Sequence, residues 1–165
     1  MAATLGADVP IFVYGKAAWA EGIGEKFQAV EIAELWYVVI FPGVTVSTAE
    51  LFADPELTRD ARPIKIRDYF AGGAGNVFEP IVRRRFPAVN SAYEWLSKMA
   101  VGQPRLPMMT GTGSCVFASF ADESTAAEIA QKAAIELPAD WQVICAKGCN
   151  ESPLAQKLES VTGVQ

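Results

Sequence analysis

Runs of apolar residues divide the chain into short predicted strands and one clear helix. A continuous apolar run from Leu35 to Phe41, ended by Pro42-Gly43, is typical of a buried central strand. Two more runs with the composition of strands cover Ser114 to Phe120 and Trp141 to Ala146. Apolar residues on one stripe from Glu123 to Leu137 predict an amphipathic helix.

The segment between the first two of these strands is predicted to be mainly helical. Ser47-Thr48-Ala49-Glu50 has the form of a capping box, which predicts a short helix from Thr48 to about Ala53. Further helices are expected over Ile64 to Ala71 and, in two pieces separated at Phe86-Pro87, over Val77 to Met99. The order strand, helices, strand, helix, strand predicts a split α+β fold with helices on one face of a sheet.

The first 34 residues follow a different, strand-rich pattern. Pro10 to Tyr14 combines β-branched and aromatic residues after a proline suited to the first position of a strand. Ala17 to Glu21 predicts a return strand, and Lys26 to Ile32 a further extended stretch. The pattern begins abruptly, so we expect the chain to be the later part of something longer. The expected division is a domain remnant over 1–34, a complete domain over 35–154 and a tail over 155–165. We expect the chain to be mobile from Glu151 onward.

Composition and charge narrow the class of protein. With 51% apolar and 20% charged residues, the 165-residue chain has the balance of a globular protein rather than a disordered one. The net charge of −5 argues against general binding to nucleic acid or to anionic membranes. No apolar run reaches the length of a membrane span, and the first residues lack the pattern of a secretory signal. We therefore expect a cytoplasmic protein without nucleic-acid or membrane partners.

The chain contains no histidine, which excludes Ser-His and Cys-His catalysis, histidine metal sites and an imidazole switch. Acid–base chemistry must then come from Asp, Glu, Lys, Tyr or Cys. Cys115, Cys145 and Cys149 cannot all pair and cannot supply a four-thiolate zinc site. We expect three reduced thiols in a reducing compartment, and no metal site on the protein.

The sequence Met109-Thr110-Gly111-Thr112-Gly113-Ser114 leads directly into a predicted strand. Its two glycines permit positive φ, and its successive amides and three hydroxyls can form an anion-binding concavity. A tight loop-to-strand turn accounts for the same residues, so both interpretations stay open. The segment is neither a Walker loop, because no Gly-Lys-Ser/Thr follows, nor a dinucleotide fingerprint, because Val116 replaces the third glycine.

Three further features each have a chemical and a plain structural interpretation. Asp8, between apolar neighbours just before a predicted strand, is either a carboxylate base or a local turn former. Arg83-Arg84-Arg85 either binds phosphate or, as we favour, forms a solvated helix face. Phe52 either packs in the core or offers an aromatic surface to a ligand ring. The tryptophans are expected to be core or partly buried residues: Trp19, Trp36, Trp95 and Trp141.

Taken in order, several motifs resemble those of a known family. LGADVPIFV, AAWAEGIGE, FPGVTVSTAELF with DPEL, and MTGTGSCVFASF look like segments of the 4-diphosphocytidyl-2-C-methyl-D-erythritol kinases. These are ATP-dependent kinases of the non-mevalonate isoprenoid pathway, within the GHMP kinase superfamily. The resemblance extends from about Leu5 to Leu154. It implies the end of a GHMP kinase N-terminal domain over 1–34, followed by a complete ferredoxin-like split C-terminal domain.

The resemblance also implies roles for individual residues. Asp8 in GADVP matches the family's catalytic aspartate, which deprotonates the substrate hydroxyl. Thr48 and Phe52 in STAELF match positions on the substrate side, with the phenyl ring of Phe52 against the cytosine. The TGTGS loop, Thr110 to Ser114, matches the third motif, which supports the active-site cleft. Val77 departs from the Asn-Asp of many members, so its neighbours receive no site assignment.

The implied reaction transfers the γ-phosphoryl group of ATP to the 2-hydroxyl of the diphosphocytidyl-methylerythritol substrate, with Mg²⁺ bridging phosphate oxygens. A carboxylate base suits this chemistry and needs no histidine. Full-length family members begin with a Lys-containing first motif and a PxxxGLGGGSS loop that wraps the ATP phosphates, and the partner aromatic for the cytosine lies in that region too. These motifs do not occur here. We therefore expect weak ATP affinity and no kinase activity from the chain alone, and dimerisation or poor solubility through uncovered edges.

Two other functions stay open. A split α+β domain with a TGTGS loop is compatible with a small-molecule binding or regulatory module that never catalyses. Its sign would be folding and saturable ligand binding by residues 35–154 without residues 1–34. A related GHMP kinase that acts on another small alcohol is disfavoured, because the pairing of GADVP with PGVTVSTAELF points to the diphosphocytidyl substrate.

Overall fold

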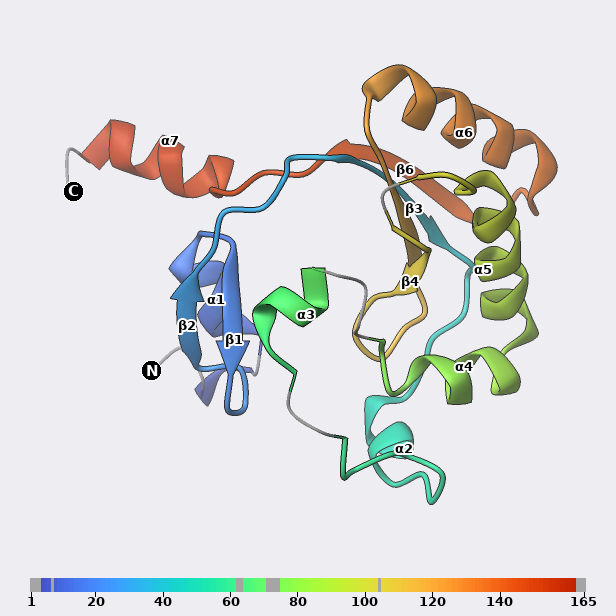
Figure 1. Cartoon of the computed structure of the whole chain (residues 1–165), viewed down its shortest axis with the longest axis horizontal. Helices are drawn as coiled ribbons and strands as arrows, with labels where there is room; N and C mark the ends of the chain where they lie inside the picture. Colours follow the sequence, from blue (N-terminus) through green and yellow to red (C-terminus); the bar gives the residue numbers. More distant parts are fainter. Residues whose placement is uncertain (1–3, 7, 62–63, 71–74, 104, 163–165) are drawn as a thin grey trace. The chain divides into compact units, whose positions relative to one another are not determined.

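The computed structural model of the chain describes residues 4–6, 8–61, 64–70, 75–103 and 105–162 (Figure 1). Its contacts divide into two compact units, a larger one of residues 35–147 and a smaller one of residues 1–34 and 148–165.

The larger unit is built on a four-stranded antiparallel sheet in the order β4-β5-β3-β6. In β3 the central residue Val38 lies opposite Ala118 on one side and Cys145 on the other. Val38 and Ile40 are fully buried, whereas Val39 between them is only partly buried. This alternation shows that one face of the sheet is packed on the core. The strands are β3 (Trp36–Phe41), β4 (Met108–Met109), β5 (Val116–Phe120) and β6 (Gln142–Lys147).

The helices α5 and α6 pack on that face of the sheet (Figure 1). The core between helices and sheet includes Phe120, Leu96 and Ala126, all fully buried. The element order and the antiparallel pairing confirm the predicted split α+β fold. The helices of this unit are α2 (Thr48–Phe52), α3 (Ile66–Phe70), α4 (Glu79–Arg85), α5 (Pro87–Met99) and α6 (Glu123–Glu136).

Local sequence explains where these helices begin and end. The Ser47 hydroxyl accepts a hydrogen bond from the Glu50 amide at the start of α2, as the capping box predicts (3.3 Å). Asp122 caps α6 through the Thr125 amide (2.9 Å), and Pro138 follows just after its end. The break at Phe86-Pro87 separates α4 from α5 as expected. Ala71, the expected end of the helix that precedes α4, lies outside the described residues.

The smaller unit contains a hairpin of β1 (Ala18–Glu21) and β2 (Lys26–Ala29), in which Trp19 pairs with Gln28. The expectation of a strand over Pro10 to Tyr14 is wrong, because Val9–Tyr14 forms the helix α1. Pro10 lies in its first turn, where a missing amide hydrogen costs nothing, and Gly15 ends it with φ 71° and an amide bonded to the Ile11 carbonyl. These two signals outweigh the β-branched and aromatic composition.

The segment from Glu151, expected to be a mobile tail, contains a further helix. Pro153–Thr162 forms the helix α7, while residues 163–165 lie outside the described part. The Ser152 hydroxyl accepts from the Ala155 amide, and Pro153 occupies the first helical position. Within the same unit, Asn150 bonds to both the amide and the carbonyl of Ile32, at 2.9 and 2.8 Å. The Ser-Pro start and this pairing order the segment.

The structure also bears on the predictions for the cysteines, the tryptophans and the arginine run. All three cysteines are free, and all four tryptophans are partly buried, as expected. In the run Arg83-Arg84-Arg85, Arg84 and Arg85 are exposed, as the favoured interpretation of a solvated helix face predicts. The three guanidiniums also form ion pairs, with Glu79, Glu56 and Asp54, respectively. Within the described residues, none of the helices is both long and apolar enough to cross a membrane.

Candidate functional site

The helix α2 carries two of the predicted site residues in the larger unit. Thr48 is its first residue and Phe52 its last. The side chain of Leu51 between them is buried (1% exposed), whereas Phe52 is 58% exposed. The same short helix thus uses one residue for the core and presents its neighbour to solvent.

The ring of Phe52 is supported by the ring of Phe78. Its centroid lies 5.1 Å from that of Phe78, with the rings at 75° in an edge-to-face arrangement. The Arg59 guanidinium donates to the Phe52 carbonyl at 2.7 Å and to the Asp54 carbonyl at 2.9 Å, which fixes the chain as it leaves α2. An exposed and braced ring is a suitable surface for stacking a planar ligand group. The core interpretation of Phe52 therefore does not describe its environment.

The TGTGS loop, Thr110 to Ser114, is a tight turn closed by backbone hydrogen bonds. The Thr110 amide donates to the Cys115 carbonyl (2.9 Å), and the Gly113 amide to the Thr110 carbonyl (2.7 Å). Gly111 and Gly113 have φ of 45° and 91°, a region that other residues rarely adopt. A Cβ at Gly113 would lie 3.0 Å from the Met109 sulfur, a contact close enough that the Met109 side chain would have to shift. The structure accounts for both glycines without a ligand.

The three hydroxyls of this loop have different environments. Ser114 is buried, and its Oγ donates to the Val44 carbonyl. The Thr112 Oγ1 lies 3.1 Å from the Thr48 Oγ1, and either hydroxyl can donate. Thr110 is exposed. The Thr48–Thr112 contact brings α2 and the TGTGS loop together, so Thr48, Phe52 and the loop belong to one local site.

Asp8 lies in the smaller unit, directly before α1. Its side chain is exposed and makes no cap hydrogen bond to the helix. The carboxylate is therefore accessible to a reacting hydroxyl, as a base requires.

Two ionisable side chains, Cys115 directly after the loop and Tyr93 of α5, have raised pKa values. Burial raises the pKa of the Cys115 thiol, which keeps this neighbour of Ser114 protonated and unreactive at neutral pH. Burial, then the nearby Glu79 carboxylate, raises the pKa of Tyr93. No group of three or more acidic or cysteine side chains among the described residues is placed to hold a metal ion.

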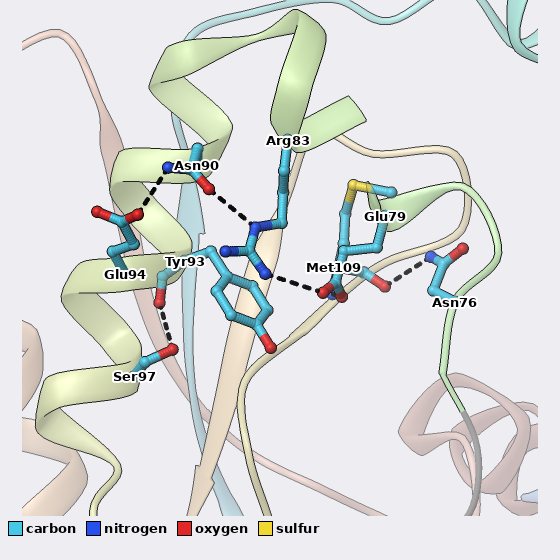
Figure 2. Close-up of polar contacts among 8 residues, drawn as sticks. All are labelled: Asn76, Glu79, Arg83, Asn90, Tyr93, Glu94, Ser97 and Met109. Carbon is cyan, nitrogen blue, oxygen red and sulfur yellow. Dashed lines mark hydrogen bonds and ion pairs between the residues drawn. The ribbon is translucent and has the colours of Figure 1, made fainter. Parts of the chain in front are cut away.

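Sequence analysis missed the side chains that hold the loop in place. Asn76, just before α4, and Glu79, its first residue, both bond to the backbone of Met109 (Figure 2). Asn76 also bonds to the Gly111 carbonyl. A local signal exists, since Asn-Val-Phe-Glu has the spacing of a helix capping motif. That signal predicts a helix start but not contacts with residues 30 to 35 positions away.

Comparisons with known proteins first define the class. The family model of the GHMP kinases C terminal matches residues 57–139, about half of the chain. The chain therefore belongs to the GHMP kinases, in the family of their C-terminal domains. This confirms the class that the motifs indicated.

The relatives within this class share one name. A 4-diphosphocytidyl-2-C-methyl-D-erythritol kinase from Nitrosococcus oceani is 50% identical over 155 residues, which cover 94% of this chain and 52% of the relative. One from Pseudomonas aeruginosa is 47% identical over 157 residues, covering 95% and 52%. A crystal structure of 4-(cytidine 5'-diphospho)-2C-methyl-D-erythritol kinase is similar with a TM-score of 0.68 and 27% identity, covering 88% of this chain and 54% of that one. The chain spans about half the length of the curated relatives it matches.

Proposed function

We propose that this chain is the C-terminal part of a longer kinase that transfers the γ-phosphoryl group of ATP to the 2-hydroxyl of 4-diphosphocytidyl-2-C-methyl-D-erythritol, in the non-mevalonate isoprenoid pathway. The names of the relatives and their greater length support this proposal. Asp8 is the catalytic base, Thr48 and Phe52 bind the substrate, and the TGTGS loop supports the cleft. The three free cysteines are consistent with a cytoplasmic location.

The observation that carries the proposal is the exposed ring of Phe52, braced by Phe78 and adjacent to the Thr48–Thr112 contact. A large apolar ring that is 58% exposed contributes little to the core. A base stacked on such a ring gains about 1–3 kcal/mol. The cytosine of the substrate is the planar group that this surface would bind.

Two of the three hydroxyls of the TGTGS loop already have partners within the structure. The hydroxyls of Ser114 and Thr112 already bond to Val44 and Thr48, which leaves the TGTGS loop a supporting role. The phosphates would be held by a glycine-rich loop in the part of the kinase that precedes Leu5, as the family resemblance implies. Mg²⁺ would then enter with the ATP phosphates, neutralising charge during transfer. The chain alone is accordingly expected to be inactive.

Several large apolar side chains of the smaller unit are exposed, as expected if another protein segment packs against them. Phe12 and Val13 of α1 are 81% and 73% exposed, and Leu154 and Val161 of α7 are each 77% exposed. The rest of the kinase, or a second copy of the chain, would cover such surface. We expect the isolated chain to dimerise. Sedimentation that shows a monodisperse monomer would contradict this expectation.

Reconstitution tests the proposed reaction. The N-terminal half of the Nitrosococcus oceani relative, fused ahead of this chain, supplies the expected ATP loop. We expect ATP-dependent phosphorylation of the diphosphocytidyl substrate, followed by ³¹P NMR of the new phosphomonoester. Asp8→Asn should lower kcat by about 10²–10⁴-fold with little change in substrate binding, whereas Asp60→Asn, at another exposed aspartate, should not. Near-normal turnover by Asp8→Asn would remove Asp8 from the catalytic role.

The chain alone provides the complementary test. Calorimetric titration of the 165-residue chain with ATP and Mg²⁺ should show only weak binding. Tight, Mg²⁺-dependent ATP binding would contradict the proposal that the phosphate-binding loop lies outside this sequence.

A further inference from the structure

One short segment, Asn76–Glu79, contacts the backbone at the TGTGS loop and also the ring of Phe52 in the larger unit. We propose that it is a positioning segment: Asn76 and Glu79 set the backbone of the TGTGS loop, and Phe78 sets the ring of Phe52. The inference rests on the proposed function for the identity of the ligand.

Asn76 uses its whole amide group. Its Nδ2 donates to the Met109 carbonyl at 3.0 Å and to the Gly111 carbonyl at 2.6 Å, while its Oδ1 accepts from the Phe78 amide at 3.0 Å. Both donor hydrogens and the acceptor are satisfied, which fixes the orientation of the amide. The two carbonyls flank Thr110, the first residue of the loop. Asn76 thereby determines how the chain enters the loop.

Glu79 holds the same point from the other side. Its Oε2 accepts from the Met109 amide at 3.1 Å, and its Oε1 pairs with the Arg83 guanidinium at 3.5 Å (Figure 2). Arg83 in turn donates to the Asn90 Oδ1 at 3.0 Å and lies 3.7 Å from the centre of the Tyr93 ring. The Glu79 side chain is only 15% exposed. Met109 is therefore held at both its amide and its carbonyl by partners that are themselves fixed.

Phe78 connects this arrangement to Phe52. Its amide is bonded by the Asn76 side chain, and its ring braces the Phe52 ring at 5.1 Å. The Thr48–Thr112 contact closes the link from α2 back to the loop. A displacement of the segment would consequently move the loop and the aromatic surface together. This arrangement gives the segment a positioning role for both the loop and the Phe52 ring.

Asn76→Asp in the 165-residue chain tests the first part. The substituted side chain keeps its shape and its acceptor for Phe78, but it turns an oxygen toward two carbonyls and loses both donor bonds. Amide hydrogen exchange at Thr110 and Gly113 should become at least about tenfold faster. Exchange at β3 amides should not change. Asn90→Asp keeps the oxygen acceptor for Arg83 and loses only the donor to Glu94, so it should leave all these rates unchanged.

These outcomes decide the positioning role. Unchanged exchange at Thr110 and Gly113 in Asn76→Asp would overturn it, as would an equal increase in Asn90→Asp or an increase that includes β3. Asn76→Ala, which removes the donors without adding charge, is the second variant if Asn76→Asp does not fold. Unfolding of both would assign Asn76 to the stability of the fold and would also overturn the proposal.

Cytidine 5'-diphosphate serves as the ligand probe. Phe78→Leu should shift the Phe52 ring protons in NMR spectra and weaken the affinity for this nucleotide by about threefold to tenfold. Unshifted Phe52 protons would overturn the role of Phe78. If the unmodified chain does not bind the nucleotide, the affinity is measured on the fusion with the N-terminal half of the Nitrosococcus oceani relative. Absence of binding by that fusion would show that the proposed ligand is wrong, while the exchange and ring-proton measurements still decide the positioning role.

Discussion

Leu51 and Phe52 are adjacent on α2 but differ in exposure, which predicts opposite consequences of replacing each by alanine. Leu51 is 1% exposed, and emptying such a site costs about 2–5 kcal/mol of unfolding free energy. Phe52 is 58% exposed, so less than half of its surface is covered. At about 25 cal/mol per Å², the loss of that covering is worth about 2 kcal/mol at most.

Affinity for cytidine 5'-diphosphate should show the reverse order. Loss of a stacked base removes about 1–3 kcal/mol, so Phe52→Ala should weaken binding by about fivefold to 150-fold. Urea unfolding gives the stability of each variant, and chemical-shift titration gives its affinity. Ile135→Ala, at an 83% exposed position of α6, is the control for loss of an exposed apolar side chain. Undiminished nucleotide binding by Phe52→Ala would refute the reasoning.

Other predictions address the core, the thiols and a helix cap. Phe120→Ala, at a fully buried position of β5, should lower the unfolding free energy by about 3–5 kcal/mol in urea titrations, whereas Ile135→Ala should change it by less than about 0.5 kcal/mol. Iodoacetamide at pH 8 should label the exposed Cys149 first, because burial raises the pKa of Cys115 and of Cys145; peptide mass spectrometry showing Cys115 labelled first would contradict this. Hydrogen bonds from Ser124 and Thr125 lower the pKa of Asp122 in the folded protein. The charged carboxylate therefore stabilises the fold at pH values above the ordinary aspartate pKa. This stabilisation is lost as the pH falls through the lowered pKa. The melting temperature of Asp122→Ala should therefore lie below that of the unmodified chain at pH 7, and the gap should narrow below about pH 4; a constant gap would be inconsistent with this assignment.

The sequence predicts those parts of the fold whose signals are local. The apolar run of β3, the Ser47 cap of α2 and the proline at the first position of α5 each determine an element within a few residues. Local composition misleads for α1, where β-branched residues suggest a strand but Pro10 and Gly15 favour a helix. The same holds for α7, whose Ser-Pro start is a short signal in an otherwise weak segment.

The candidate site is predicted less completely, because its supports connect distant residues. Thr48, Phe52 and the TGTGS loop can be found from motifs. The contacts of Asn76 with Met109 and Gly111 span 33 and 35 positions. Periodicity and capping rules describe only near neighbours, so they do not indicate such contacts. The contacts of Asn76 form only when the antiparallel sheet brings the loop against the start of α4.

The central claim is that this chain forms one part of a longer kinase. Sequencing the DNA directly upstream of the Met1 codon tests it most directly. We predict an in-frame extension that encodes a PxxxGLGGGSS-like loop, which would supply the missing ATP-binding part. An in-frame stop codon immediately upstream, with no such loop encoded, would contradict the claim and would favour a binding module that does not catalyse.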